Sequence, residues 1–319
     1  MNNLKKIGLT ALAGSLVATS VAYAGALEAT GSAEMKMTNN SQSAAGKTIG
    51  MGNSIYFKGS GETDSGLNVA LSFELDQGAS DGAAGVYDNH SVSVGNDSLG
   101  TLTVHGHGGS NAAAALDTTA AGDLWDNTLM DTTAVLSTRS APFASTSGNN
   151  LMVYSLPTMV DGLALSGSYQ ATNTTGTGST AWGGSYTGIE GLSVSYGQGS
   201  SDNVKDIAGD QSIMKASYAY GSLTVGASHN DYDHTTASND QSVTSYSIAY
   251  TVSDEISVTY GQETIDRSGQ AQDIEVSGVS ASYTSGGMTA SIAQVEAQDT
   301  DYTAGLDKEV WKIGLSFAF

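Results

Sequence analysis

The sequence contains no cysteine and only 2 prolines among its 319 residues. Without cysteine the protein has neither disulfide bonds nor thiol chemistry. The 2 prolines stand against 40 glycines and many serines, threonines, tyrosines and valines, a mixture that favours strands and tight turns over helices. We therefore expect an all-β protein held together by its strand hydrogen bonds, and a closed barrel is one such solution.

Basic residues are also scarce, with 11 lysines and arginines against 32 acidic residues. A protein of this sign does not bind the phosphate backbone, so nucleic acid is excluded as a partner. Catalytic motifs are missing too, because no Gly-x-Ser-x-Gly elbow lies between a strand and a helix. Gly108-Gly109 lacks the lysine and the helix of a phosphate-binding loop. We therefore do not expect an enzyme or a cofactor.

Long apolar runs are absent after the first residues, and a helix that crosses a bilayer needs about 20 of them. The N-terminal run Ile7 to Val17 is shorter, follows Lys5 and Lys6, and precedes Ala22-Tyr23-Ala24. This order of basic, apolar and small residues is typical of a cleaved signal peptide. We predict a signal peptide over residues 1–24 and one mature domain over residues 25–319. That domain, with 9 basic and 32 acidic residues, has a formal net charge of −23.

Alternating large apolar and small or polar residues are the main feature of what remains. From Trp311 to Phe319 every second residue is large and apolar, which is the period of a strand. Short connections rich in Gly, Asp, Ser or Asn recur at residues 62–66, 95–100, 157–162, 187–191, 220–222, 252–255 and 284–287. Eight longer polar connections lie between them, so fifteen connections predict sixteen antiparallel strands. Aromatic rings flank the short turns, as in an interfacial girdle, at Tyr186, Tyr220, Tyr250 and Tyr283.

Three stretches resemble the general porins of Gram-negative outer membranes, most closely those of the alphaproteobacterial type. They are Ile55 to Phe73, Asn150 to Leu165, and Lys312 to Phe319. The resemblance implies a transmembrane antiparallel β-barrel of 16 strands, assembled as a homotrimer in outer-membrane lipid, with a long third loop folded into the lumen. It also implies a water-filled channel for passive diffusion of small hydrophilic solutes and ions.

Residues 106–149 match the third loop of that family in place and length, and a loop so long is usually functional. In the family, carboxylates on this loop face basic side chains on the barrel wall. We therefore expect an acidic side of the constriction made of Asp117, Asp123, Asp126 and Asp131. Strand alternation and position in the loop give the basic side as Lys36, Lys58, Lys215, Lys312 and Arg139. An acidic constriction in so acidic a chain predicts cation preference, and a solvated surface loop is the alternative.

Metal sites have weaker support in the sequence. His105-Gly-His107 puts two imidazoles on one side of a strand, but no third ligand accompanies them, so pore-lining polar residues are the simpler interpretation. Asp231-Tyr-Asp233 and Asp299-Thr-Asp301 offer oxygen ligands for calcium, although solvated loop charge explains them as well.

Two other functions stay open at this point. A substrate-specific outer-membrane channel would need a binding track in its lumen, such as an aromatic ladder. A secreted β-rich surface structural protein or adhesin would need neither the terminal aromatic strand nor the tyrosine girdle.

Overall fold

The computed structural model describes residues 27–40, 47–76, 87–125, 148–171, 178–201 and 209–319. The predicted signal peptide lies outside these residues, as do Asp126, Asp131 and Arg139. Among the described residues, no helix has the length and the apolar character needed to cross a membrane.

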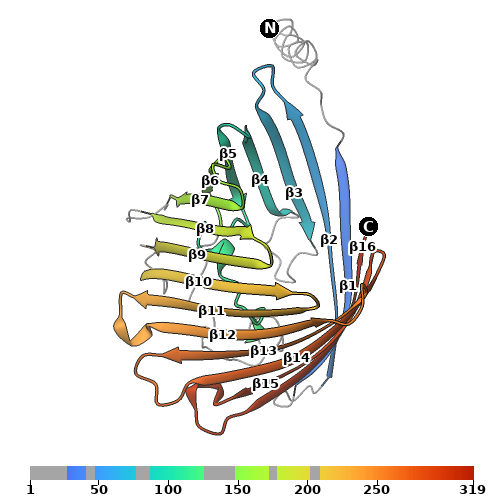
Figure 1. Cartoon of the computed structure of the whole chain (residues 1–319), viewed down its shortest axis with the longest axis vertical. Helices are drawn as coiled ribbons and strands as arrows, with labels where there is room; N and C mark the ends of the chain where they lie inside the picture. The colour runs from blue at the N-terminus through green and yellow to red at the C-terminus, as the bar shows by residue number, and fades with distance from the viewer. Residues whose placement is uncertain (1–26, 41–46, 77–86, 126–147, 172–177, 202–208) are drawn as a thin grey trace, which may run out of the picture.

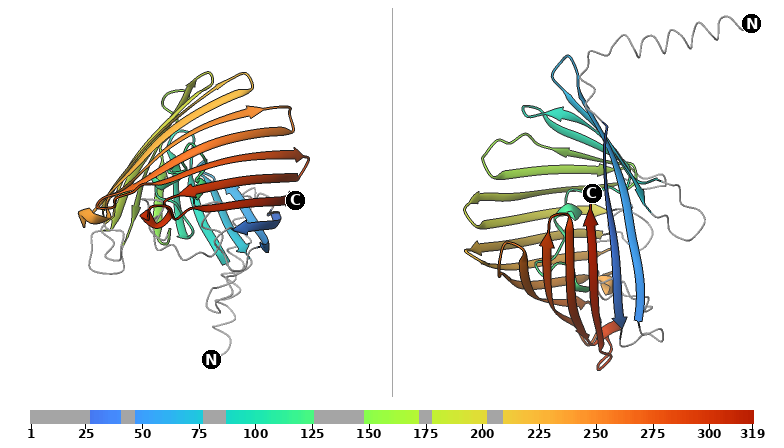
Figure 2. Two further views of the ribbon diagram at one scale, coloured as in Figure 1. Left: turned by 90° about the horizontal axis from the view of Figure 1, so that it is seen from below. Right: turned by 90° about the vertical axis from the view of Figure 1, so that its right-hand side faces the viewer.

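Sixteen strands of the described residues form one closed antiparallel barrel (Figures 1 and 2). Each strand pairs with the strands before and after it in the sequence, and β16 closes the barrel by pairing with β1. This confirms the strand number, the topology and all seven predicted short turns. The strands are β1 (Glu28–Asn40), β2 (Lys47–Glu62), β3 (Asn68–Asp76), β4 (Tyr87–Asn96), β5 (Gly100–His107), β6 (Leu151–Ser155), β7 (Leu163–Gln170), β8 (Ser179–Ile189), β9 (Leu192–Ser201), β10 (Gly209–Tyr220), β11 (Leu223–His234), β12 (Gln241–Thr251), β13 (Ile256–Arg267), β14 (Ile274–Ser285), β15 (Met288–Gln298) and β16 (Lys308–Ala318).

The two ends of the barrel differ in their connections. The short turns all lie at one end, and at the β4–β5 turn Gly100 adopts a φ of 76° that favours glycine. A Cβ at this glycine would lie 2.3 Å from the carbonyl oxygen of Ser155, so a larger residue has no room. The longer connections at the other end include the 3-10 helices η1 (Ala114–Leu116), η4 (Ala237–Asn239) and η5 (Thr300–Tyr302).

The pairing register assigns each side chain to the outer face or to the lumen, because directly paired residues share a face. Exposed apolar side chains line the outer face, as expected for contact with lipid. Phe57 and Phe73 stack there with ring centroids 5.0 Å apart. The rings of Tyr220, Tyr250 and Tyr283 are also exposed beside short turns, as the girdle prediction requires.

Candidate functional site

The residues after β5 turn into the barrel and follow its inner wall (Figure 1). We call residues 108–125 the inward segment. Its backbone N–H groups donate to hydroxyls on three separate wall strands: Ala112 to Ser168 of β7 at 2.9 Å, Ala120 to Ser228 of β11 at 2.9 Å, and Ala121 to Ser245 of β12 at 2.8 Å. The described part of the predicted third loop therefore lies inside the barrel, against its wall.

Glycines on the lumen face allow this close approach. A Cβ on Gly183 would lie 2.4 Å from the carbonyl oxygen of Ala112, and a Cβ on Gly261 would lie 2.7 Å from the Cβ of Ala121. At Gly197 the nearest atom is the Cα of Ala113, at 3.1 Å. Gly197 and Gly261 occupy equivalent places in two similar stretches of sequence, at residues 193–198 and 257–262. The wall thus has a shallow path that fits an alanine-rich segment.

Glu263 of β13 holds the far end of the inward segment. Its carboxylate accepts the hydroxyl of Thr119 at 2.5 Å and the backbone N–H groups of Leu124 at 3.0 Å and Trp125 at 3.1 Å. Only 3 % of Glu263 is exposed, so three donors compensate for the burial of this carboxylate. Sequence analysis missed Glu263, although strand alternation from Ile265 puts it in the lumen.

An apolar cluster inside the barrel completes the attachment of the inward segment. Trp125 is 1 % exposed and packs with side chains of β12 to β16, and Leu124 packs against the same cluster. Tyr302 of η5 belongs to it too, and its hydroxyl accepts a 2.6 Å hydrogen bond from the amide of Gln241. The other members are Val243, Ile265, Ile274, Val276, Val295, Ala297 and Val310.

Two of the predicted acidic residues lie on the inward segment. Asp123 adopts a left-handed φ of 53°, and its carboxylate accepts the N–H of Thr119 at 2.8 Å. The carbonyl oxygen of Asp117 accepts the side-chain amide of Asn230 at 2.9 Å, which fixes the backbone at this residue. Both aspartates are half-buried at the surface of the inward segment. Asp126 and Asp131 are outside the described residues.

The predicted basic residues fall into two groups. Lys215 of β10 lies beside the acidic residues, because its ammonium donates to the carbonyl oxygen of Thr118 at 2.7 Å. Lys36 pairs with Gly50 and Gly314, Lys312 pairs with Thr38, and both point into the lumen from β1 and β16. Lys58 of β2 pairs with Glu28 on the same face. The structure therefore brings Lys215 together with Asp117 and Asp123, and it places the other three lysines on another part of the wall.

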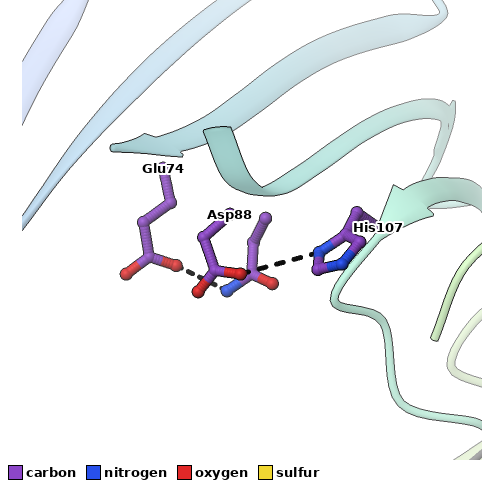
Figure 3. Close-up of polar contacts among 4 residues, drawn as sticks. Glu74, Asp88 and His107 are labelled. Carbon is purple, nitrogen blue, oxygen red and sulfur yellow. Dashed lines mark hydrogen bonds and ion pairs between the residues drawn. The ribbon is translucent and has the colours of Figure 1, made fainter. Parts of the chain in front are cut away.

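The paired histidines are a correction to the sequence analysis. The register shifts between His90 and Ser91, so Ser91 pairs with His105 while His90 pairs with His107. The β-bulge at Gly106 therefore puts His105 in the lumen and His107 on the outer face, and the two do not share a metal. Instead, Nδ1 of His107 lies 3.7 Å from a carboxylate oxygen of Asp88 (Figure 3). The described residues hold no group of three His, Asp or Glu side chains placed to bind a metal ion.

The comparison with protein families bears directly on this arrangement. Residues 8–303 match the family described as Gram-negative porin. The chain belongs to the Gram-negative porin family. Such a protein is a non-enzymatic diffusion channel of the outer membrane, and this porin has the barrel and the inward segment on which a channel depends.

Solved structures show the same fold. The anion-selective porin from Comamonas acidovorans matches with a TM-score of 0.69 and 17% sequence identity, over 92% of this chain and 99% of that chain. A triple mutant of the Rhodopseudomonas blastica porin matches with a TM-score of 0.65 and 17% identity, over 92% of this chain and 100% of that chain. Comparison with curated proteins finds no significant match. At such identities the likeness extends to the fold and not to the selectivity of the pore.

Proposed function

We propose that this porin is a general diffusion pore for small hydrophilic solutes and ions, that it prefers cations, and that it works as a homotrimer. The observation that carries the cation preference is the course of the inward segment. It lies along the lumen wall and carries Asp117 and Asp123, which are half-buried and which we infer to face the passage. Rings or clusters of carboxylates in a pore select ions by the sign of their charge.

Neighbouring carboxylates weaken the positive potential of the lysines. Glu28 pairs with Lys58 on the lumen face of β1 and β2. Glu34 follows the same face of β1, two residues before Lys36. The ammonium of Lys215 lies beside the inward segment itself, so it offsets part of the acidic charge there. The acidic excess of the whole chain, 32 acidic residues against 11 basic ones, then favours a negative potential in the passage.

The test is the reversal potential of single channels in a planar bilayer under a salt gradient. We expect a cation-selective potential, with conductance steps in groups of three for a trimer. The double variant Asp117→Asn with Asp123→Asn moves the potential toward anions, whereas Glu296→Gln, an exposed change on the outer face of β15, leaves it in place. Anion preference in the parent protein would refute the acidic constriction. That outcome would match the property named for the Comamonas porin.

Three more specific properties of this porin also remain predictions. They are the signal peptide at residues 1–24, the alphaproteobacterial type of the porin, and the roles of Asp126, Asp131 and Arg139 at the constriction. Mass spectrometry of the mature N-terminus tests the first, with Gly25 as the expected first residue. Calcium in the loops is tested by the same bilayer recordings with and without a chelator.

A further inference from the structure

Polar side chains cover the lumen face of β2 to β5. Lys58, Ser72, Ser91 and His105 pair across the four strands, and one step toward the short turns Ser60, Ala70, Ser93 and Thr103 do the same. One step toward the longer loops lie Tyr56, Glu74 and Asn89, where the amide of Asn89 donates to the Glu74 carboxylate at 2.5 Å (Figure 3). We call these side chains the polar ladder, namely Tyr56, Lys58, Ser60, Ser72, Glu74, Asn89, Ser91, Ser93, Thr103 and His105.

Two hollows lie in the wall along the part of the polar ladder nearest the short turns. The first has a volume of about 290 Å³ and is lined by Lys58, Ser60, Ser72 and Ser91 among others. The second, of about 540 Å³, continues toward the short turns. Ala70 and Ser93 line both hollows, so the two lie side by side. Adjacent hollows of these sizes suit a molecule of one or two sugar rings.

Tyr56 is an aromatic residue in the lumen. It pairs with Thr30 and Glu74, whereas its neighbour Phe57 lies on the outer face against Phe73. The ammonium of Lys58 lies 5.9 Å from the centre of the Tyr56 ring. Tyr56 lies at the end of the hydroxyl rows that is nearest the longer loops, and its ring provides an apolar surface next to hydrogen-bond donors and acceptors.

The hydrogen bonds that hold residues 108–125 lie on wall strands other than β2 to β5. The described part of the inward segment is bonded to β7, β10, β11, β12 and β13. The polar ladder occupies β2 to β5, which none of those bonds reaches. The start of the inward segment lies beside one edge of the ladder, since a Cβ on Gly108 would lie 1.3 Å from the Asn89 amide oxygen and a Cβ on Gly109 would lie 2.6 Å from the His105 ring. Among the described residues, Lys58, Ser60, Ser72, Ser91 and Ser93 therefore keep their hollow clear of those hydrogen bonds.

We propose that the polar ladder is a binding track for neutral polyhydroxylated solutes, that is, sugars and sugar alcohols. Each serine or threonine hydroxyl both donates and accepts a hydrogen bond, and this matches a sugar hydroxyl that does the same. Lys58 and Glu28 pair on this face and offset each other's charge, and the carboxylate of Glu74 lies one step farther toward the longer loops, where it does not line the hollow. The Tyr56 ring offers a surface for the C–H face of a sugar ring. This inference rests on the proposed function of an open diffusion pore.

The test measures ion current through the purified full-length mature protein in a planar bilayer while sucrose is added. We expect the current to fall along a saturation curve, beyond the decrease that bulk viscosity causes. A poly(ethylene glycol) of matched hydrodynamic radius, which offers almost no hydroxyl donors, causes only the viscosity effect. The double variant Ser72→Ala with Ser91→Ala raises the half-saturating sucrose concentration about tenfold, because it removes two hydrogen-bonding hydroxyls.

A matched control and a second variant keep the result unambiguous. Ser217→Ala with Ser280→Ala removes two hydroxyls from the lumen faces of β10 and β14, outside the polar ladder, and leaves the sucrose curve unchanged. Tyr56→Ala weakens sucrose binding without altering the serines. A parent channel that conducts ions but shows no saturation with sucrose overturns the binding track and keeps the pore. Absence of any current overturns the proposed function itself.

Discussion

Replacing Glu263 by alanine should release the inward segment from the barrel wall. The change removes the acceptor of three hydrogen bonds, from the Thr119 hydroxyl and from the N–H groups of Leu124 and Trp125. A buried donor left without an acceptor costs about 1–3 kcal/mol. Water in the lumen satisfies some of these donors, so we expect a net loss of about 3 kcal/mol for the docked segment. Such a loss lowers the ratio of docked to undocked states about a hundredfold.

Single-channel recording detects this release as closures. A segment that leaves the wall enters the passage, so the Glu263→Ala channel should spend more time closed, and closures should begin at lower voltage. The closed fraction of Glu263→Gln channels should lie between those of Glu263→Ala and the parent protein. The amide keeps one acceptor oxygen but places an NH₂ donor against the N–H groups.

The control for this prediction is Glu275→Ala on the adjacent strand β14. Glu275 pairs with Thr264, is exposed, and faces outward, so its loss removes one carboxylate without touching the inward segment. Circular dichroism checks that both variants retain the barrel. If Glu263→Ala gates like Glu275→Ala and like the parent protein, Glu263 does not hold the segment and the reasoning fails.

Three further predictions follow from contacts elsewhere in the molecule. Gly261→Leu should displace the inward segment, because even a Cβ there would lie 2.7 Å from the Cβ of Ala121; a parent-like conductance and closed fraction would contradict the tight path. Burial raises the pKa of the Tyr302 hydroxyl above its ordinary value of 10.0. The neutral hydroxyl therefore stabilises the folded protein below pH 10, and this contribution is lost as the pH rises through the pKa of the folded state. The rate of limited proteolysis in the η5 loop should therefore increase between pH 8 and 11 in the parent protein, and it should increase less in Tyr302→Phe. Deletion of Phe319 removes its two backbone hydrogen bonds to Gly31, of 2.6 and 3.0 Å, so the yield of heat-modifiable folded barrel should fall, and an unchanged yield would exclude a closing role.

The number of strands and their faces were predictable because the signals are local. Each short turn carries its own Gly, Asp, Ser or Asn, and alternation along a strand assigns a side chain to lipid or lumen without knowledge of its partners. The two similar stretches at residues 193–198 and 257–262 occupy β9 and β13 in equivalent positions, with Tyr196 and Tyr260 outward. The prediction failed at His107, where one extra residue at Gly106 reverses the alternation.

The attachment of the inward segment to the wall could not be predicted from the sequence, for a different reason. The bonds of Glu263 join residues 138 to 144 positions apart, and no spacing along the chain indicates such a pair. Alternation does put Glu263 in the lumen, and the alanines at 112–115 and 120–121 are visible in the sequence. Only the closed barrel shows that these alanines lie against Gly183, Gly197 and Gly261.

That placement also changes what the lumen charges do. Sequence alternation gave four lysines of equal standing opposite an acidic loop, but Lys215 lies on the same side as Asp117 and Asp123, at the carbonyl oxygen of Thr118. Opposed charges create a field across the passage, whereas adjacent opposite charges cancel at a distance. We therefore propose that Lys36 and Lys312 supply the field from the far wall, and we expect Lys215→Gln to strengthen the cation preference of the pore. A shift of the reversal potential toward anions in that variant would show that Lys215 acts less by repelling cations than by ordering the inward segment.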